Sequence, residues 1–253
     1  MSQPVRTEAP RVSKSRLYLI GKLAQMQGSP VRRVLKRMRL QRPFPFLINK
    51  YYSELAFQRR WAPVFQDNKP KVLEYWKRYR YFDEIVALAG LDDASVVLDV
   101  GCGVSTVLHF VPGQRYGIDP FAEEYRKFYA YTPELHIQKG FGEHIPFGDV
   151  FFDVVLSSNM LDHCTDPRMM VAEIHRVLKP GGYLVLTVEI FHSKVTRGLA
   201  HLHSLTRDEV PELLAGKFEV CFERTSPWIQ LTSYVTGTNK VEGEQLITVL
   251  RRA

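Results

Sequence analysis

Short β-rich runs alternate with helical segments throughout the part of the sequence that follows Gly90. The β-rich runs are SVVLDV, RYGID, ELHIQ, FFDVVLSS and YLVLTVEI, and the segments between them include STVLHF, AEEYRKFYA and DPRMMVAEIHRVLK. Continuous apolar strands that alternate with helices indicate a parallel sheet covered on both faces. The sequence therefore predicts a doubly wound α/β fold.

One helix is marked at both ends. Asp166 is a favourable N-cap residue, and Pro167 suits the first helical position. The expected apolar stripe consists of Met170, Ile174, Val177 and Leu178, and KPGG is expected to end the helix. Further along, Thr206 and Glu209 have the spacing of a capping box. KFEVCFERT and EQLITVLRR alternate in the way that is typical of an antiparallel pair.

Composition excludes several classes of protein. The chain has 253 residues, of which 45% are hydrophobic and 24% charged, as in ordinary globular proteins. The sequence contains no apolar run near the ~20 residues that a membrane-spanning helix needs. Three cysteines match neither a disulfide framework nor a paired zinc motif, and this usage predicts a cytoplasmic protein.

The positive charge is concentrated in residues 1–43. This segment holds 11 Lys and Arg against Glu8, a net charge of +10, whereas the rest of the chain has 23 basic and 26 acidic residues. SPVRRVLKRMRL predicts a short basic amphipathic helix in an arm that is otherwise partly disordered. The helix could dock on the globular body, on a protein partner or at a membrane surface.

The sequence predicts three regions: the arm at 1–43, a helical lid at 44–80 and a catalytic domain at 81–253. The lid is crowded with aromatic and basic side chains. Most aromatic residues at helical spacing are packing residues, but Trp76 and Tyr79 are candidate walls of a substrate pocket.

A glycine turn follows the first expected strand in VVLDVGCGVST. Gly101 and Gly103 lack Cβ atoms, so a ligand can lie directly on their backbone. The dinucleotide motif GxGxxG is not completed, because Thr106 stands at its third position. Asp119 ends the second strand, where its carboxylate could accept both hydroxyls of a ribose. Together these features predict a nucleoside ligand.

Four motifs in this order and spacing resemble the class I S-adenosylmethionine-dependent methyltransferases, in particular the small-molecule "methyltransferase 11" type. They are VVLDVGCGVST, GIDP, GEHIPFGDVFFDVVLSSNMLDHCTDP and RVLKPGGYLVLTVE. The resemblance covers roughly residues 80–253. It implies a Rossmann-like seven-stranded sheet of order 3-2-1-4-5-7-6 with the last strand antiparallel, and S-adenosyl-L-methionine as the cofactor.

The resemblance also implies roles for individual residues. The expected cofactor-binding set is Asp99, Gly101, Cys102, Gly103, Asp119, Pro120, Gly142, Glu143, Ser158 and Asn159. Asp99 and the glycines would surround the methionyl group, and Asp119 would bind the ribose. Pro120, Gly142 and Glu143 would border the adenine. Ser158 and Asn159 would close over the methionyl part. Phe141 stands where many members of the family have an aspartate, so either it stacks on the base or Glu143 accepts from the adenine.

Some of these residues have alternative interpretations. Asp99 could cap the turn, Glu143 could be a solvated loop residue, and Cys102 could pack beneath the turn as a small apolar side chain.

A hydroxyl acceptor would benefit from a base near neutral pKa, and His163 is the first candidate because NMLDHCTDP follows the fourth strand. The alternative is that His163 orients the loop, and Asp162 is a weaker rival as base. His192, His201 and His203 follow the fifth strand and are secondary candidates for substrate contact. No metal-binding spacing such as HExxH is present, so we expect no metal.

The acceptor is expected to be a small molecule or a glycan-type biosynthetic intermediate, because no nucleic-acid-binding module is recognisable. Two alternatives stay open. The chain could be an RNA methyltransferase that grips phosphates with its basic arm, or a non-catalytic partner protein that binds the cofactor without turnover.

Overall fold

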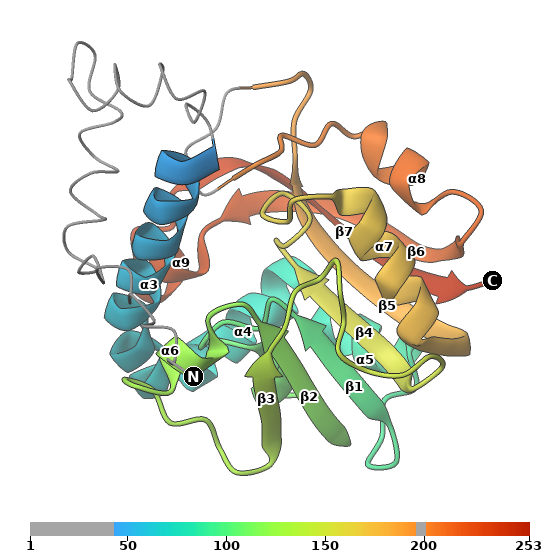
Figure 1. Ribbon diagram of the computed structural model, residues 1–253, viewed down its shortest axis with the longest axis horizontal. Helices are drawn as coiled ribbons and strands as arrows, with labels where there is room; N and C mark the ends of the chain where they lie inside the picture. Colours follow the sequence, from blue (N-terminus) through green and yellow to red (C-terminus); the bar gives the residue numbers. More distant parts are fainter. Residues whose placement is uncertain (1–42, 196–200) are drawn as a thin grey trace, which may run out of the picture. The chain divides into compact units, whose positions relative to one another are not determined.

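The computed structural model describes residues 43–195 and 201–253 (Figure 1). The chain divides into two compact units, residues 1–54 and 55–253. The expected amphipathic helix and nearly all of the basic arm lie outside the described residues. Among the residues that are described, no helix is both long enough and apolar enough to cross a membrane.

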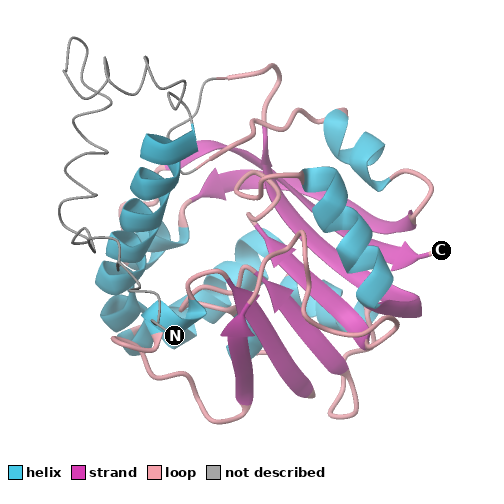
Figure 2. Ribbon diagram, viewed as in Figure 1, coloured by secondary structure: helices cyan, strands magenta, loops and turns pink. Residues whose placement is uncertain are grey.

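The second unit contains a seven-stranded sheet, drawn in magenta in Figure 2. Its strands are β1 (Val96–Val100), β2 (Gln114–Asp119), β3 (Leu135–Lys139), β4 (Phe152–Ser158), β5 (Leu178–Ile190), β6 (Phe218–Ile229) and β7 (Val241–Arg252). The order is β3-β2-β1-β4-β5-β7-β6, and β7 pairs antiparallel with both of its neighbours. The predicted doubly wound fold, strand order and antiparallel last strand are confirmed.

Helices cover both faces of this sheet (Figure 1). One face packs against residues 55–67 of α3 (Pro43–Asp67) and against α4 (Lys69–Arg80), α5 (Phe82–Leu88), α6 (Ala122–Tyr125) and α9 (Leu231–Val235). The other packs against α7 (Pro167–Val177) and α8 (Glu209–Leu214). Alternate residues of each strand enter the two cores, which is why buried strands read as continuous apolar runs.

The aromatic segment after residue 68 forms two helices because Tyr81 breaks it. Tyr81 adopts a left-handed backbone, with φ of 53° and ψ of 44°, and its N–H donates to Trp76 O. This break reverses the chain between α4 and α5. Arg80 is thereby placed at the end of α4.

The helix at Asp166 begins as predicted but ends earlier. The Asp166 side chain accepts from the backbone N–H groups of Arg168 and Met169. The predicted stripe placed Leu178 in the helix, which was wrong: Leu178 has extended dihedral angles and pairs with Phe152 of β4. KPGG therefore lies in the opening stretch of β5, where sheet pairing overrides the helical spacing.

Two other expectations were only partly correct. STVLHF forms a single turn of 3-10 helix, η1 (Val107–His109). At the expected capping box, Glu209 Oε2 accepts from Thr206 N at 2.9 Å. However, α8 begins at Glu209 itself, and the Thr206 hydroxyl donates to the same carboxylate at 3.1 Å. The reciprocal half of the box is therefore not formed.

Candidate functional site

The glycine turn follows β1 and has no room for side chains. Gly101 and Gly103 have φ of 78° and 53°. A Cβ at Gly101 would lie 2.1 Å from Cγ of Met160, and one at Gly103 would lie 3.0 Å from Nε2 of Gln58. The N–H of Gly101 donates to Ile118 O of β2 at 2.8 Å. The turn is thus anchored to the neighbouring strand, and the Met160 and Gln58 side chains pack directly against its glycines.

Asp119 ends β2 and is 6% exposed. Its Oδ2 accepts from the N–H of Gly103 at 3.1 Å, and its Oδ1 accepts from the N–H of Phe121 at 2.8 Å. These two contacts hold the carboxylate at the end of β2, and its contact with the ribose hydroxyls stays a prediction. Pro120 is the residue between Asp119 and Phe121 in the sequence, and its contact with the adenine stays a prediction.

Asp99 lies beneath the turn. The Thr106 hydroxyl donates to Asp99 Oδ2 at 2.6 Å, and Thr106 Oγ1 accepts from Leu108 N at 3.1 Å. Burial raises the pKa of Asp99 to about 7, although the bond from Thr106 acts in the opposite direction. These contacts match the alternative in which Asp99 supports the turn. A contact with the methionyl group stays a prediction.

Ser158 and Asn159 stand at the carboxyl end of β4. Asn159 has φ of 53°, and its N–H donates to Thr187 O of β5 at 2.8 Å. Its side-chain Oδ1 is buried and accepts no hydrogen bond from the described residues. Because a buried polar atom without a partner is costly, this oxygen suits a ligand donor such as an amine.

Arg80 reaches Ser158 from α4. It is 4% exposed, and its Nη1 donates to Ser158 Oγ at 2.6 Å and to Thr187 Oγ1. The guanidinium lies 5.5 Å from the Tyr75 ring and 5.1 Å from the Trp76 ring. Within the described part of the chain, no ion pair joins it to a carboxylate. Arg80 thus brings a buried positive charge to the edge where the expected cofactor residues lie.

Of the residues expected near the adenine, Gly142 is closely packed, Glu143 is hydrogen-bonded to the backbone, and Phe141 is exposed. Gly142 packs so closely that a Cβ there would lie 2.8 Å from Sδ of Met170. Glu143 Oε1 accepts from the backbone N–H groups of Thr165 and Asp166, so Glu143 anchors the start of α7. Phe141 is 51% exposed and is available for stacking. Contacts of these residues with a base stay predictions.

The two segments that follow β4 and β5 meet at Asp162. The Asp162 side chain is 2% exposed, and its Oδ2 lies 2.6 Å from Nδ1 of His201. Nε2 of His163 lies 3.8 Å from the same oxygen, and the two imidazole ring centroids are 4.3 Å apart. The three side chains each offer a ligand atom, and these atoms lie within 4.8 Å of one another. Two predicted catalytic residues and one predicted substrate residue are therefore neighbours.

The other predicted substrate residues do not join this group. His203 Nε2 lies 3.0 Å from Cys164 O, and His192 is exposed. Trp76 belongs to the core below Arg80, and the Tyr79 ring packs against Tyr75 and Tyr234. Their contact with a substrate stays a prediction.

Cys102 is buried beneath the turn, and burial raises the pKa of its thiol well above the usual range. This environment matches the packing interpretation and disfavours a thiolate nucleophile.

Sequence reasoning missed three side chains that shape the site. Gln58 Oε1 of α3 accepts from Val104 N at 3.2 Å, and the Tyr131 hydroxyl donates to Gly103 O at 2.7 Å. Arg80 is the third. Each is far in sequence from the atoms it contacts, and no local pattern marks it.

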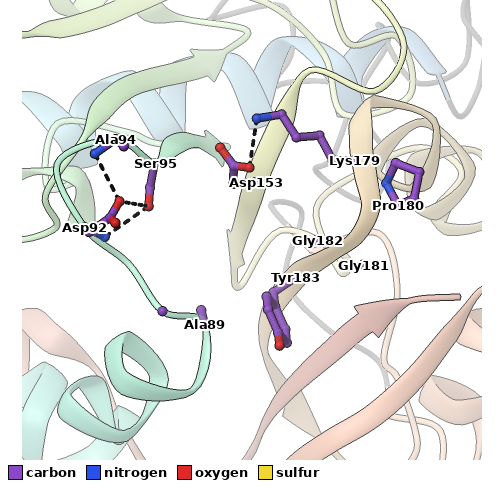
Figure 3. Close-up of a pocket in the computed structure, with 11 residues that line it drawn as sticks. Ala89, Asp92, Ala94, Ser95, Asp153, Lys179, Pro180, Gly181, Gly182 and Tyr183 are labelled. Atoms are coloured by element: carbon purple, nitrogen blue, oxygen red, sulfur yellow. Dashed lines mark hydrogen bonds and ion pairs between the residues drawn. The ribbon is translucent and has the colours of Figure 1, made fainter.

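A pocket of about 410 Å³ lies at the opposite end of the strands (Figure 3). Its polar side chains satisfy one another: Lys179 Nζ lies 2.8 Å from Asp153 Oδ1, and Asp92 Oδ1 accepts from the Ser95 hydroxyl at 2.9 Å. Ligands of doubly wound sheets bind beyond the carboxyl ends of the strands, whereas this pocket lies at the amino ends of β1 and β4. We therefore place the functional site at the glycine turn.

The glycine turn lies within the part of the chain that matches a known family. Residues 98–186 match the family model described as a methyltransferase domain. Methyltransferase-like protein 27 of Homo sapiens is 30% identical over 171 residues, which are 65% of this chain and 68% of that protein. A malonyl-[acyl-carrier protein] O-methyltransferase of Marinomonas sp. is 28% identical over 155 residues, 56% of each chain.

The fold is shared with solved structures. An S-adenosylmethionine dependent methyltransferase from Mesorhizobium loti superposes with a TM-score of 0.52 at 14% identity, covering 70% of this chain and 99% of that one. The chain spans only about half the length of two of the relatives that it matches. It covers 54% of a protein from Streptomyces fradiae and 56% of the Marinomonas protein.

The seven-stranded fold is shared with methyltransferases. The chain belongs to the class I S-adenosylmethionine-dependent methyltransferases. The fold implies that it binds S-adenosylmethionine. The glycine turn, the acid at the tip of β2 and the Asn159 oxygen, which has no partner among the described residues, fit a ligand with a ribose and an amine.

Proposed function

We propose that this protein transfers a methyl group to a hydroxyl of a small-molecule or glycan-type biosynthetic intermediate. The observation that carries the proposal is the group formed by Asp162, His163 and His201 beside the carboxyl end of β4. A hydroxyl must lose its proton when its oxygen is methylated, and these side chains are proton acceptors. The Marinomonas relative is also named for O-methylation.

The residues around the turn would hold the cofactor. Asp99, Gly101 and Gly103 would lie at the methionyl group and Asp119 at the ribose, while Ser158 and Asn159 would close over the methionyl part. Pro120, Gly142 and Glu143 would border the adenine. When bound, S-adenosylmethionine supplies a methyl group on a positively charged sulfur, which makes that methyl strongly electrophilic.

The protein's own contribution would be alignment and the exclusion of water. Attack on a sulfonium methyl neutralises charge, so a dry and correctly oriented site accelerates it. The glycine turn would hold one reactant, and the second would enter beside the His and Asp side chains on the loops after β4 and β5.

The basic arm would suit an acceptor that is anionic or lies at a membrane, or a protein partner that delivers the acceptor. Its net charge of +10 favours such surfaces electrostatically. A lipid-linked sugar is one acceptor of this kind.

The test is methyl transfer by the purified full chain. The protein is incubated with methyl-labelled S-adenosylmethionine and a panel of hydroxylated metabolites, glycans and lipid-linked sugars, with total RNA as a separate arm. We expect S-adenosylhomocysteine and an alkali-stable methyl ether in the first arm. Label in RNA that disappears at high salt, or cofactor binding without turnover across the whole panel, would contradict the proposal.

A further inference from the structure

His163 and His201 both lie beside Asp162, but only His201 is within hydrogen-bond distance of its carboxylate. The Asp162 backbone O accepts from Leu202 N at 2.7 Å and from His203 N at 3.1 Å. Together with the bond between side chains, these contacts fix the segment around His201 to the loop after β4. His201 therefore has a defined position although it is 39 residues away in sequence.

The hydrogen bond to Asp162 also selects the tautomer of His201. A carboxylate only accepts, so the 2.6 Å contact requires the His201 proton to be on Nδ1. Nε2 then carries the lone pair, and it has no partner among the described residues. The His201 side chain is 29% exposed, which leaves this nitrogen within reach of a ligand.

His163 lacks this arrangement. Its Nε2 is 3.8 Å from Asp162 Oδ2, too far for a hydrogen bond, and its ring packs against the His201 ring. A shared metal ion also fits poorly, because two ligand atoms on one ion are separated by roughly 3.0–3.4 Å at usual bond lengths, whereas the Asp162 and His201 atoms are 2.6 Å apart.

We infer that His201, and not His163, is the base that takes the proton of the acceptor hydroxyl, and that Asp162 is its positioning residue. This inference rests on the proposed O-methylation. As the acceptor oxygen forms its bond to the methyl carbon and the electron pair of the carbon–sulfur bond stays on sulfur, the hydroxyl proton passes to Nε2 of His201. The Asp162 carboxylate stabilises the imidazolium that results.

The surrounding charges do not compete for this role. Among the described residues, the titratable groups in recorded contact with His201 are Asp162 and His163, and His203 on its own segment is bonded to Cys164 O. Lys194 on the same connection is paired with Glu209.

The test compares His201→Gln with Asp162→Asn and with His163→Gln, which removes the rival base, and the matched control is His136→Gln, an exposed histidine of β3. With an acceptor found in the panel above, we expect His201→Gln to lower kcat by ~100- to 10,000-fold and to abolish the fall in rate at acidic pH, with the Kd for S-adenosylhomocysteine unchanged. His163→Gln should keep the wild-type pH profile. Asp162→Asn should lower kcat without abolishing that profile, and thermal melts verify folding of each variant.

A second readout needs no turnover. Nitrogen-15 NMR of the full chain should place the neutral His201 proton on Nδ1, and Asp162→Asn should redistribute it, whatever the acceptor proves to be. A proton on Nε2 in the wild type, an unchanged kcat in His201→Gln, or activity lost with chelator and restored by a divalent metal would each overturn the assignment. Transfer to an amine or carbon acceptor would refute the proposed O-methylation, while the NMR result would still decide the tautomer.

Discussion

Asp119 at the tip of β2 accepts a hydrogen bond from the backbone N–H of Gly103 at 3.1 Å, so the expected ribose acid and the glycine turn are directly joined. The carboxylate therefore has two roles: it would meet the ligand, and it fixes the backbone on which the ligand would lie. Substitution at this position should affect both.

Asp119→Ala should weaken binding of S-adenosylhomocysteine about 100-fold or more, because each hydrogen bond to a charged group contributes ~1.5–3 kcal/mol. It should also lower the melting temperature by a few degrees, since Gly103 and Phe121 lose their acceptor. Titration calorimetry and thermal melts measure the two effects. Glu134→Ala, which removes an exposed acid before β3, is the control. Equal affinities for the two variants would refute the ribose assignment.

Gly101→Ala should destabilise the fold by about 1–3 kcal/mol and weaken cofactor binding. The backbone at φ of 78° disfavours an L side chain, and the new Cβ would displace Met160. Gly148→Ala is the matched control, because nothing lies within 4 Å of a Cβ there. Urea denaturation of both variants measures the difference. A neutral effect at Gly101 would mean that the turn is less constrained than its contacts indicate.

Asp99 should make stability depend on pH. Its folded pKa of about 7 lies above the ordinary value of 3.8, so the folded state binds the proton more tightly. The stabilisation is complete below about pH 4 and is lost as pH rises towards and through 7, by at most ~4 kcal/mol. Asp99→Asn should remove this pH-dependent part of the free energy of unfolding, while its amide oxygen still accepts from the Thr106 hydroxyl. Urea denaturation from pH 5 to pH 8 gives the free energy of unfolding of the wild type and of Asp99→Asn. If the prediction is wrong, the two free energies will change with pH in the same way.

Arg80→Met should leave the free energy of unfolding unchanged or raise it by ~1–2 kcal/mol. The guanidinium is buried against neutral hydroxyls and aromatic rings, so its desolvation is not offset by a carboxylate within the described residues. Arg80→Ala, which also removes the packing on Tyr75 and Trp76, should be destabilising. Denaturation in guanidinium chloride compares the two. A large loss in Arg80→Met would indicate that the hydrogen bonds to Ser158 and Thr187 outweigh the cost of burying the charge.

Local patterns were enough to predict the sheet, the glycine turn and the position of Asp119 at the end of β2, because apolar runs and glycine turns are properties of adjacent residues. They misplaced Leu178, where pairing with Phe152 overrides the helical stripe. They also could not reveal the pairing of Asp162 with His201, or of Arg80 with Thr187, because these contacts join residues 39 and 107 positions apart. Candidate His163 was selected from its motif, whereas the close contact with the carboxylate belongs to a histidine from another loop.

The position of β7 has a consequence for biosynthesis. β7 lies between β5 and β6 and pairs with both along most of its length, yet it follows both of them in the sequence. As the chain leaves the ribosome, β5 and β6 are both synthesised before the strand that joins them. The nascent protein therefore cannot close its sheet until residues 241–252 have emerged from the ribosome.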